Sequence, residues 1–563
     1  MSMSILKPYG ATPSQRQIKH FREYGKKAFF HFGVNTFSNL EWGNGNETEA
    51  IFNPTDTDVK QWIRVVKDAG FTLAILTVKH HDGFCLWPSE HTGHSIKNSP
   101  YKDGKGDILR EFVDACHEYG VAVGIYMSPW DRNNELWGTA EYSKYYNKQL
   151  TEVLTNYGKI DEVWWDGAGS TETVYDWGLW AYTVRNLQPD AVIFGSFGAT
   201  PYTECRWIGN EAGISHDPHY PTIKTEHLEK EITSELNSGN FDGDRFVIAE
   251  ADMSIRPGWF YHKHQDDFVK TPKQLIDLWF NSVGNSALML LNFPPDRRGL
   301  VYDTDAKNAL EAHKIITKAL SVNLADEATV SSSSVREGFP AQNIIESDYN
   351  KVFASSDSDI NPVIEIDLCE KKRFDTIILG EYVELGIRVC GYKVEALCDG
   401  KWKLIADKKS IGYKKAVHFE PIEAEKIKLS IYKAVAAPIL REFGLYNFRD
   451  NGYNANEQRP PRTKTTDIVA ENPGASFEYS EDGATVMLGG LYPFNTIKFN
   501  GENIRDFEIM VFDGLQFYSA FKGTSDGKEV TVCFDDAEIA AYQFKIVTNC
   551  KTDSSMNIRV YSN

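Results

Sequence analysis

The fold is decided by the stretch Lys159-Ile160-Asp161-Glu162-Val163-Trp164-Trp165-Asp166-Gly167-Ala168-Gly169. The pattern predicts a short apolar strand that ends in one carboxylate, Asp166, and the glycines behind it allow another molecule to approach the backbone closely. Asp also ends strands in ordinary turns, so this stretch alone leaves open whether Asp166 is a turn residue or a functional group. The rest of the chain is needed to choose between the two.

Length and composition indicate a large globular chain whose ligand is not a polyanion. With 563 residues the chain is long enough for several domains, and its 42% hydrophobic and 25% charged residues are typical of soluble proteins. The aromatic share of 13% suits carbohydrate handling, because flat rings stack on the apolar C–H faces of sugars, although large cores also use such rings. A net charge of −19 without a basic run argues against a nucleic-acid partner.

The first 320 residues alternate apolar runs with helical periodicity, a pattern typical of parallel β/α units. Eight runs are expected to be strands, which predicts a (β/α)8-like, TIM-type barrel. The spacing after the fifth run is irregular, so we expect the second half of the barrel to be distorted. The predicted strands cover residues 28–33, 73–78, 121–127, 161–165, 191–195, 205–208, 246–249 and 287–292.

In such barrels the active site lies at the carboxyl ends of the strands, so the residues that follow each run are the candidates for chemistry. They are rich in histidine, tryptophan and carboxylates, which favours a function for Asp166 over a turn. The candidates are His31, Glu41, Trp42, His80, His81, Tyr126, Trp130, Asp166, Glu211, Glu250 and Trp259.

Four classes of reaction compete for these residues: metal-dependent hydrolysis, serine hydrolysis, nucleotide chemistry and glycoside hydrolysis. The histidines and carboxylates could bind a metal, but tandem His80 and His81 on an extended segment would point to opposite faces, which disfavours ligation of one ion. No G-x-S-x-G elbow and no phosphate-binding glycine loop is present. Glycoside hydrolysis needs two carboxyl groups, one ionised and one protonated. Asp166 fits the first, and we prefer Glu211 over Glu250 for the second.

Four segments, in this order, resemble the α-L-fucosidases of glycoside hydrolase family 29: His31-Phe32-Gly33, Lys79-His80-His81-Asp82-Gly83-Phe84, Val163-Trp164-Trp165-Asp166-Gly167 and Arg206-Trp207-Ile208-Gly209-Asn210-Glu211. The resemblance implies a retaining enzyme without metal or cofactor, with Asp166 as nucleophile. It also implies that the fucose hydroxyls are bound by His31, Glu41, Trp42, His80 and His81, and that Trp259 faces the methyl group of the sugar.

The Trp207–Glu211 segment is similar to the subgroup that removes α-1,3/1,4-linked fucose from Lewis-type oligosaccharides. Glu211 is therefore the predicted acid/base, and a retaining pair should lie roughly 5–5.5 Å apart. Tyr126 and Trp130, at the end of the third strand, complete the predicted substrate site. The alternatives are a metal-dependent hydrolase that uses the strand-end histidines, and a carbohydrate-binding protein with an inactive barrel.

The second half changes to short alternating runs with turn signals, which predict two β-sandwich domains after the catalytic barrel of residues 1–320. Residues 321–450 resemble a discoidin-like module, a linker covers 451–462, and 463–563 is expected to be a second sandwich of similar type. The second sandwich is predicted from a repeat, since Phe374-Asp375-Thr376-Ile377 recurs as Phe494-Asn495-Thr496-Ile497. Sugar binding and mechanical support of the barrel both remain open as its function.

The expected partner is a fucosylated oligosaccharide or glycoconjugate, and no apolar run is long enough to span a membrane. The N-terminus shows no signal peptide. The activity nevertheless predicts a secreted or periplasmic protein whose signal has been removed. Oligomeric state is not predicted.

Overall fold

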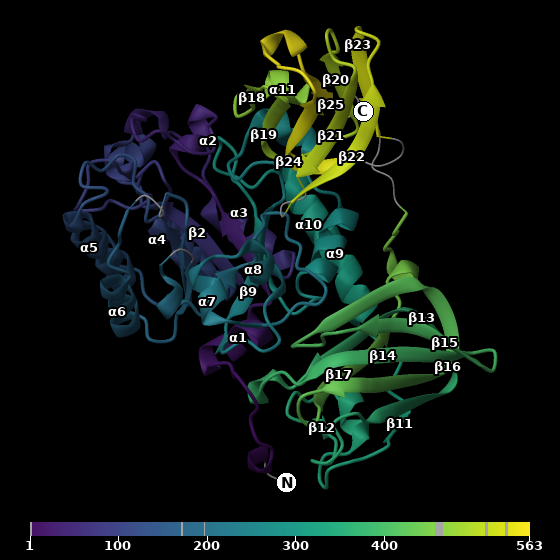
Figure 1. The fold of residues 1–563 in the computed structure, drawn as a ribbon. Helices are drawn as coiled ribbons and strands as arrows, with labels where there is room; N and C mark the ends of the chain where they lie inside the picture. Colours follow the sequence, from purple (N-terminus) through teal and green to yellow (C-terminus); the bar gives the residue numbers. More distant parts are fainter. Residues whose placement is uncertain are drawn as a thin grey trace.

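The computed structural model describes residues 3–169, 173–195, 198–456, 466–512, 516–534 and 539–562. A barrel built from the first half of the chain carries two β-rich units on one side, and these two units lie at opposite ends of that side (Figure 1). The described parts of the chain contain no helix that is long and apolar enough to cross a membrane.

The barrel is closed and parallel, with strand order β1-β10-β9-β6-β5-β4-β3-β2. All eight predicted strands are confirmed. Several bounds differ by a few residues. The first strand ends at Phe30 rather than at residue 33, and the seventh begins at Ile248 and runs to Ser254, because residues 245–246 form a separate short strand, β8. The barrel strands are β1 (Lys26–Phe30), β2 (Leu73–Lys79), β3 (Ala122–Met127), β4 (Glu162–Trp165), β5 (Val192–Gly195), β6 (Cys205–Trp207), β9 (Ile248–Ser254) and β10 (Leu288–Asn292).

Helices cover the outside of the barrel, and their ends follow capping chemistry. Thr271 and Gln274 form a reciprocal capping box at the start of α9, and Gly120 takes the left-handed conformation that ends α4. The helices are α1 (Gln15–Glu23), α2 (Val34–Ser38), α3 (Val59–Asp68), α4 (Ile108–Tyr119), α5 (Ala140–Asn156), α6 (Trp177–Leu187), α9 (Pro272–Asn281) and α10 (Asp303–Leu320).

The second half of the barrel is irregular, as the spacing predicts. Among the described residues, a short 3-10 helix, η6 (Thr200–Tyr202), takes the place of a helix between β5 and β6. Between β6 and β9 the chain forms a small two-stranded sheet and two short helices: β7 (Thr222–Ile223), α7 (Thr225–Glu229), α8 (Thr233–Ser238) and β8 (Arg245–Phe246). The mouth of the barrel is therefore shaped by loops on this side.

The middle unit is antiparallel, with the order β12-β17-β13-β16-β14-β15 and with β11 paired to β13. Two long strands, β13 and β16, run through it with shifts in register, and the sheet encloses its own apolar core. Its strands are β11 (Thr329–Ser332), β12 (Phe353–Ala354), β13 (Val363–Glu381), β14 (Val389–Cys398), β15 (Lys401–Lys408), β16 (Lys415–Ala434) and β17 (Ile439–Tyr446).

The C-terminal unit consists of two antiparallel sheets, β18-β19-β24-β21-β22 and β23-β20-β25, around a separate apolar core. Its elements are α11 (Ile468–Glu471), β18 (Ser476–Ser480), β19 (Gly483–Phe494), β20 (Thr496–Asn500), β21 (Asp506–Phe512), β22 (Phe517–Thr524), β23 (Glu529–Cys533), β24 (Ile539–Thr548) and β25 (Arg559–Tyr561). Residues 457–465, which include the second half of the predicted linker, lie outside the described residues. The proposed domain limits of 321–450 and 463–563 stay predictions.

Candidate active site

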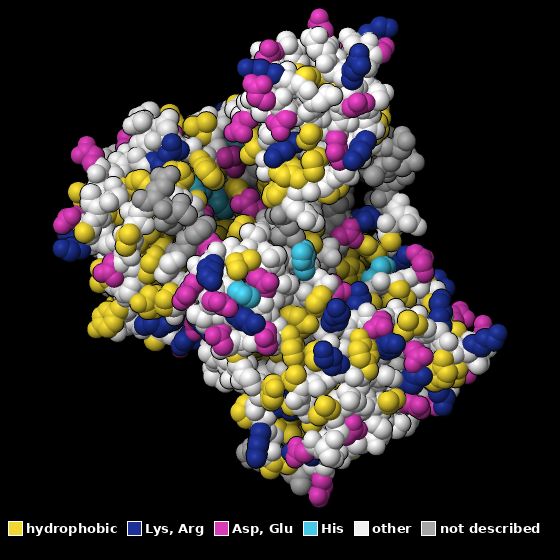
Figure 2. Space-filling view, viewed as in Figure 1, with side chains coloured by type: hydrophobic (Ala, Val, Ile, Leu, Met, Phe, Trp, Pro, Cys, Tyr) yellow, Lys and Arg dark blue, Asp and Glu magenta, His cyan; other side chains and the backbone are white. Residues whose placement is uncertain are grey.

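A cavity of about 240 Å³ opens at the carboxyl ends of the barrel strands. The face between the barrel and the C-terminal unit is hollowed, with histidine and acidic side chains deep inside it (Figure 2). Eight predicted site residues line the cavity, and aromatic rings form most of the remaining wall. The lining residues are Phe29, His31, Trp42, His80, His81, Tyr126, Trp164, Asp166, Gly167, Ala168, Phe194, Trp207, Glu211, Asp252 and Trp259.

Asp166 follows β4 directly, and its carboxylate is held by three neighbours. The Tyr126 hydroxyl donates to Oδ2 at 2.8 Å, and the backbone N–H of Ala168 donates to Oδ1 at 2.9 Å. His81 Nε2 lies 3.6 Å from Oδ2. These contacts fix the direction of the carboxylate, while 28% of the side chain stays exposed to the cavity. The carboxylate is therefore oriented and accessible to a ligand.

The tandem histidines do not point to opposite faces, so that expectation was wrong. Strand β2 ends at Lys79, and the chain turns at His80 and His81. Both rings line the cavity, with their centroids 4.1 Å apart. The alternation of side chains holds within a strand, and it fails here because the two residues lie just beyond the strand end.

Burial lowers the pKa of all three cavity histidines, so their rings are neutral near pH 7. For His31 the pKa falls to about 3. His31 Nδ1 contacts Asn292 Oδ1 at 2.9 Å, and because an amide oxygen can only accept, Nδ1 carries the proton. Nε2 of His31 is then an acceptor. Neutral rings of this kind can exchange hydrogen bonds with uncharged hydroxyl groups without demanding a charged ligand.

Glu211 follows β6, after a glycine turn at Gly209 with φ of +86°. Burial and the negative charge of Asp166 raise the pKa of the Glu211 carboxyl to about 7, against the opposing effect of hydrogen bonds with Trp259 and Tyr542. A substantial share of Glu211 is therefore protonated at neutral pH. One cavity thus holds two carboxyl groups, and that of Glu211 keeps its proton to a higher pH than an ordinary carboxyl group does.

Asp252, a third carboxyl group in the cavity, was not among the predicted site residues. Trp207 Nε1 donates to its Oδ1 at 3.0 Å. Burial, together with the charges of Glu211 and Glu250, raises the pKa of Asp252 well above its usual value. Asp252 could have been predicted from Glu250, because side chains two residues apart in a strand point to the same side. Asp252 therefore lies on the same side of β9 as Glu250, one layer nearer the mouth.

Glu250, the competing acid/base, lies below the cavity in the interior of the barrel. Trp164 Nε1 donates to Glu250 Oε1 at 2.8 Å, and the Lys27 ammonium pairs with Glu250 Oε2. The same ammonium lies 2.6 Å from Glu162 Oε2. Burial disfavours the charge on Lys27, but the two carboxylates outweigh it and raise the lysine pKa. Glu250 is thus part of a buried ion-pair network rather than of the cavity wall.

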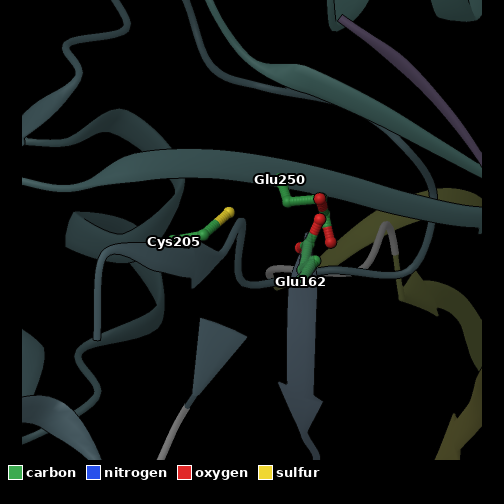
Figure 3. A group of neighbouring side chains, drawn as sticks. All are labelled: Glu162, Cys205 and Glu250. Atoms are coloured by element: carbon green, nitrogen blue, oxygen red, sulfur yellow. The ribbon is translucent and has the colours of Figure 1, made fainter. Parts of the chain in front are cut away.

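Glu162, Cys205 and Glu250 also form a group with metal-ligand chemistry, since their ligand atoms lie within 4.8 Å of one another. Figure 3 shows the carboxylates of Glu162 and Glu250 side by side, with the thiol of Cys205 nearby. The positive charge at this place is already supplied by Lys27, which bridges the two carboxylates. We therefore interpret Glu162, Cys205 and Glu250 as part of the charged core of the barrel and not as a metal site.

Two predicted site residues lie just outside the cavity. Glu41 accepts from the backbone N–H of Trp259 at 2.7 Å and contacts His262 Nε2 at 2.6 Å, so it fixes the loop that carries Trp259. The Trp130 ring packs against His81, with centroids 5.1 Å apart, and against Trp42. Direct contact of Glu41 and Trp130 with a substrate stays a prediction.

The barrel and its cavity fit the class of glycoside hydrolases, since two carboxyl groups, one with a raised pKa, face one aromatic-walled cavity lined with neutral hydrogen bonders. Comparison with known proteins narrows this class. The family model described as Alpha-L-fucosidase matches residues 12–314, and the model described as F5/8 type C domain matches residues 327–442. Alpha-L-fucosidase 1 of Arabidopsis thaliana is 36% identical over 482 residues, which cover 82% of this chain and 94% of the plant protein.

Solved structures give the same answer. A Bacteroides thetaiotaomicron structure described as an alpha-L-fucosidase is 42% identical with a TM-score of 0.77, covering 78% of this chain and 99% of that one. A Ruminococcus gnavus GH29 fucosidase, solved in complex with fucose, is 34% identical with a TM-score of 0.72, covering 78% and 96%. The chain belongs to the α-L-fucosidase family, glycoside hydrolase family 29, and carries an F5/8 type C domain. It is an α-L-fucosidase. This activity is retained in place of the two alternatives, a metal-dependent hydrolase and a carbohydrate-binding protein with an inactive barrel.

Proposed function

We propose that this α-L-fucosidase is a retaining exo-enzyme that releases terminal fucose by double displacement, with Asp166 as nucleophile and Glu211 as acid/base. The observation that carries the proposal is that Asp166 and Glu211 line one cavity, while burial and the Asp166 charge raise the Glu211 pKa to about 7. A retaining glycosidase needs this division of roles between its two carboxyl groups.

In the first step, an Asp166 oxygen forms a bond with the anomeric carbon while the bond from that carbon to the leaving oxygen breaks. Glu211 gives its proton to the leaving oxygen, which departs as a hydroxyl group. The hydrogen bonds from Tyr126 and Ala168 hold the Asp166 carboxylate in place for attack. The product of this step is a covalent fucosyl ester on Asp166.

In the second step Glu211, now ionised, takes a proton from water, and the water oxygen attacks the anomeric carbon. The bond to Asp166 breaks, Asp166 returns as a carboxylate, and fucose leaves with its original anomeric configuration. The neutral rings of His31, His80 and His81 are the proposed partners of the fucose hydroxyls. Trp259, whose ring centroid lies 5.0 Å from that of His31, is the proposed wall for the apolar side of the sugar.

The proposed linkage is α-1,3/1,4, as in branched Lewis-type oligosaccharides, and it is supported by the resemblance of the Trp207–Glu211 segment to that subgroup. Hydrolysis of a Lewis trisaccharide, 2′-fucosyllactose and an aryl α-L-fucoside tests it. We expect turnover of the trisaccharide and the aryl fucoside, with much slower turnover of 2′-fucosyllactose. Proton NMR should show that the first fucose released is the α-anomer. Initial release of β-fucose would contradict retention, and equal turnover of both oligosaccharides would contradict the linkage.

Secretion or a periplasmic location stays a prediction that fractionation of the producing cells would test. Sugar binding by the middle, F5/8 type C unit is a separate proposal.

A further inference from the structure

A second cavity of about 360 Å³ lies beside the first, in the seam between the barrel and the C-terminal unit. Its volume falls within the roughly 300–1,000 Å³ range of sites for small ligands. Trp42, Glu211 and Trp259 line both cavities, so the two spaces share a border. The barrel supplies loop residues to one wall, and the C-terminal unit supplies Asn472, Gly474, Gly489, Gly490 and Tyr542 to the other.

The position of Glu211 indicates which of the two cavities would hold the fucose and which the leaving group. An acid/base of a glycosidase must reach the glycosidic oxygen, so it stands between the sugar that is attacked and the group that leaves. Asp166 lines the first cavity and Glu211 lines both. If the proposed function holds, fucose occupies the first cavity, and the second cavity therefore lies on the leaving-group side.

Tyr542, on β24 of the C-terminal unit, connects that unit directly to the catalytic acid. Its hydroxyl donates to the backbone carbonyl of Glu211 at 2.9 Å, across 331 positions of sequence. The hydroxyl also lies beside the Glu211 side chain, where its hydrogen bond lowers the pKa of the carboxyl against burial. Tyr542 thus forms part of the wall of the second cavity and fixes the segment that carries Glu211.

The C-terminal unit is anchored to the same loop that presents Trp259. The backbone N–H of Leu491 donates to the carbonyl of Pro257 at 2.9 Å, and Gln265 Nε2 donates to the Tyr492 hydroxyl at 3.0 Å. Phe268 of the barrel is buried in the apolar core of the C-terminal unit. These contacts hold the two walls of the second cavity in a fixed relation.

The chemistry of the wall suits an uncharged sugar. Trp42 is 54% exposed at the border of the two cavities, an unusual position for so large an apolar ring. It offers a flat face to the C–H side of a pyranose, and Tyr542 offers a hydroxyl. Gly490 allows close docking of the units, since a Cβ there would lie 2.7 Å from the Pro257 carbonyl oxygen.

We propose that the C-terminal β-sandwich is part of the active site and builds the leaving-group subsite, where Tyr542 and Trp42 hold the neutral pyranose to which fucose is attached. This inference rests on the proposed function and extends it. It makes the C-terminal unit a determinant of which fucosylated glycans are cleaved, rather than a support for the barrel.

The test compares Tyr542→Ala and Tyr542→Phe with wild type in the full-length chain, on a Lewis trisaccharide and on an aryl α-L-fucoside. Tyr479→Ala, on β18 of the same unit, is the matched control, because Tyr479 stacks on Phe477 away from this wall. For Tyr542→Ala we expect kcat/KM to fall about tenfold on the trisaccharide, mainly through KM, as loss of one ring and hydrogen-bond contact predicts. The aryl fucoside, which brings no pyranose to the second cavity, should lose less than the trisaccharide, and its own loss reports the positioning of Glu211 by Tyr542.

A second readout separates a subsite from mere positioning of Glu211. Inhibition of aryl fucoside hydrolysis by the defucosylated disaccharide should weaken in Tyr542→Ala. The basic limb of the pH profile of kcat/KM should also move to higher pH, because the hydrogen bond from Tyr542 that this variant loses lowers the Glu211 pKa. Equal losses on both substrates, or a shifted pH profile with unchanged disaccharide inhibition, would overturn the subsite. Failure of wild type to cleave either fucoside would instead overturn the proposed function.

Discussion

The Tyr126 hydroxyl donates a 2.8 Å hydrogen bond to Oδ2 of Asp166, which ties the end of β3 to the carboxylate that follows β4. The two strands are neighbours in the barrel, paired in register from Gly124 and Glu162 onward. The barrel therefore sets this contact through its strand pairing, and the phenol both orients the carboxylate and stabilises its charge.

Replacing Tyr126 with Phe should lower kcat/KM on an aryl α-L-fucoside by about tenfold to a hundredfold, because a hydrogen bond to a charged group contributes roughly 1.5–3 kcal/mol. Steady-state kinetics measures the loss. Tyr146→Phe is the control, since its buried hydroxyl donates to the Met127 carbonyl away from the cavity. An unchanged kcat/KM in Tyr126→Phe would remove Tyr126 from the site.

The raised pKa of Glu211 predicts a pH dependence with a defined sign. Glu211 must be protonated to assist departure of the leaving group, so kcat/KM on an oligosaccharide should fall as pH rises through about 7. Below that pH the group keeps its proton and this limb is flat. Glu211→Gln should abolish the limb. A basic limb that persists in Glu211→Gln would assign it to another group.

The buried network below the cavity predicts a large stability effect. Lys27→Met leaves Glu162 and Glu250 without their cation, and such a loss costs about 3–5 kcal/mol of unfolding free energy. Urea unfolding followed by tryptophan fluorescence measures it. Lys60→Met is the control, because Lys60 pairs with Glu118 at an exposed site and should leave the midpoint unchanged. Equal midpoints for both variants would contradict this account of the network.

The sequence was sufficient for the barrel because apolar runs of strand length recur between helices with clear caps, and the strand-end rule then points to the site. Asp166, Glu211 and His31 were found in this way. The direction in which the His80 and His81 side chains point was not predicted correctly, because it depends on where β2 ends. The position of Glu250 below the cavity could not be predicted either, since the layer that a strand residue occupies in the barrel is set by the stagger of neighbouring strands.

Tyr542 could not have been predicted. Its contact with Glu211 depends on how a separately folded unit docks on the barrel, and no local pattern encodes a contact across 331 residues. The position of Asp252 could be predicted in part. Its alternation with Glu250 was visible in the sequence, but its place at the mouth required the register of β9 against β10, where Glu250 pairs with Leu288 and Asp252 with Leu290.

The central claim is that Asp166 attacks the anomeric carbon and Glu211 serves as acid/base, and azide tests it most directly. With an aryl α-L-fucoside, Glu211→Ala plus azide should form α-fucosyl azide, because azide replaces water in the second step. Asp166→Ala plus azide should form the β-anomer by direct displacement. The anomer is identified by NMR. Rescue of Glu250→Ala but not of Glu211→Ala, or β-azide from Glu211→Ala, would contradict the assignment.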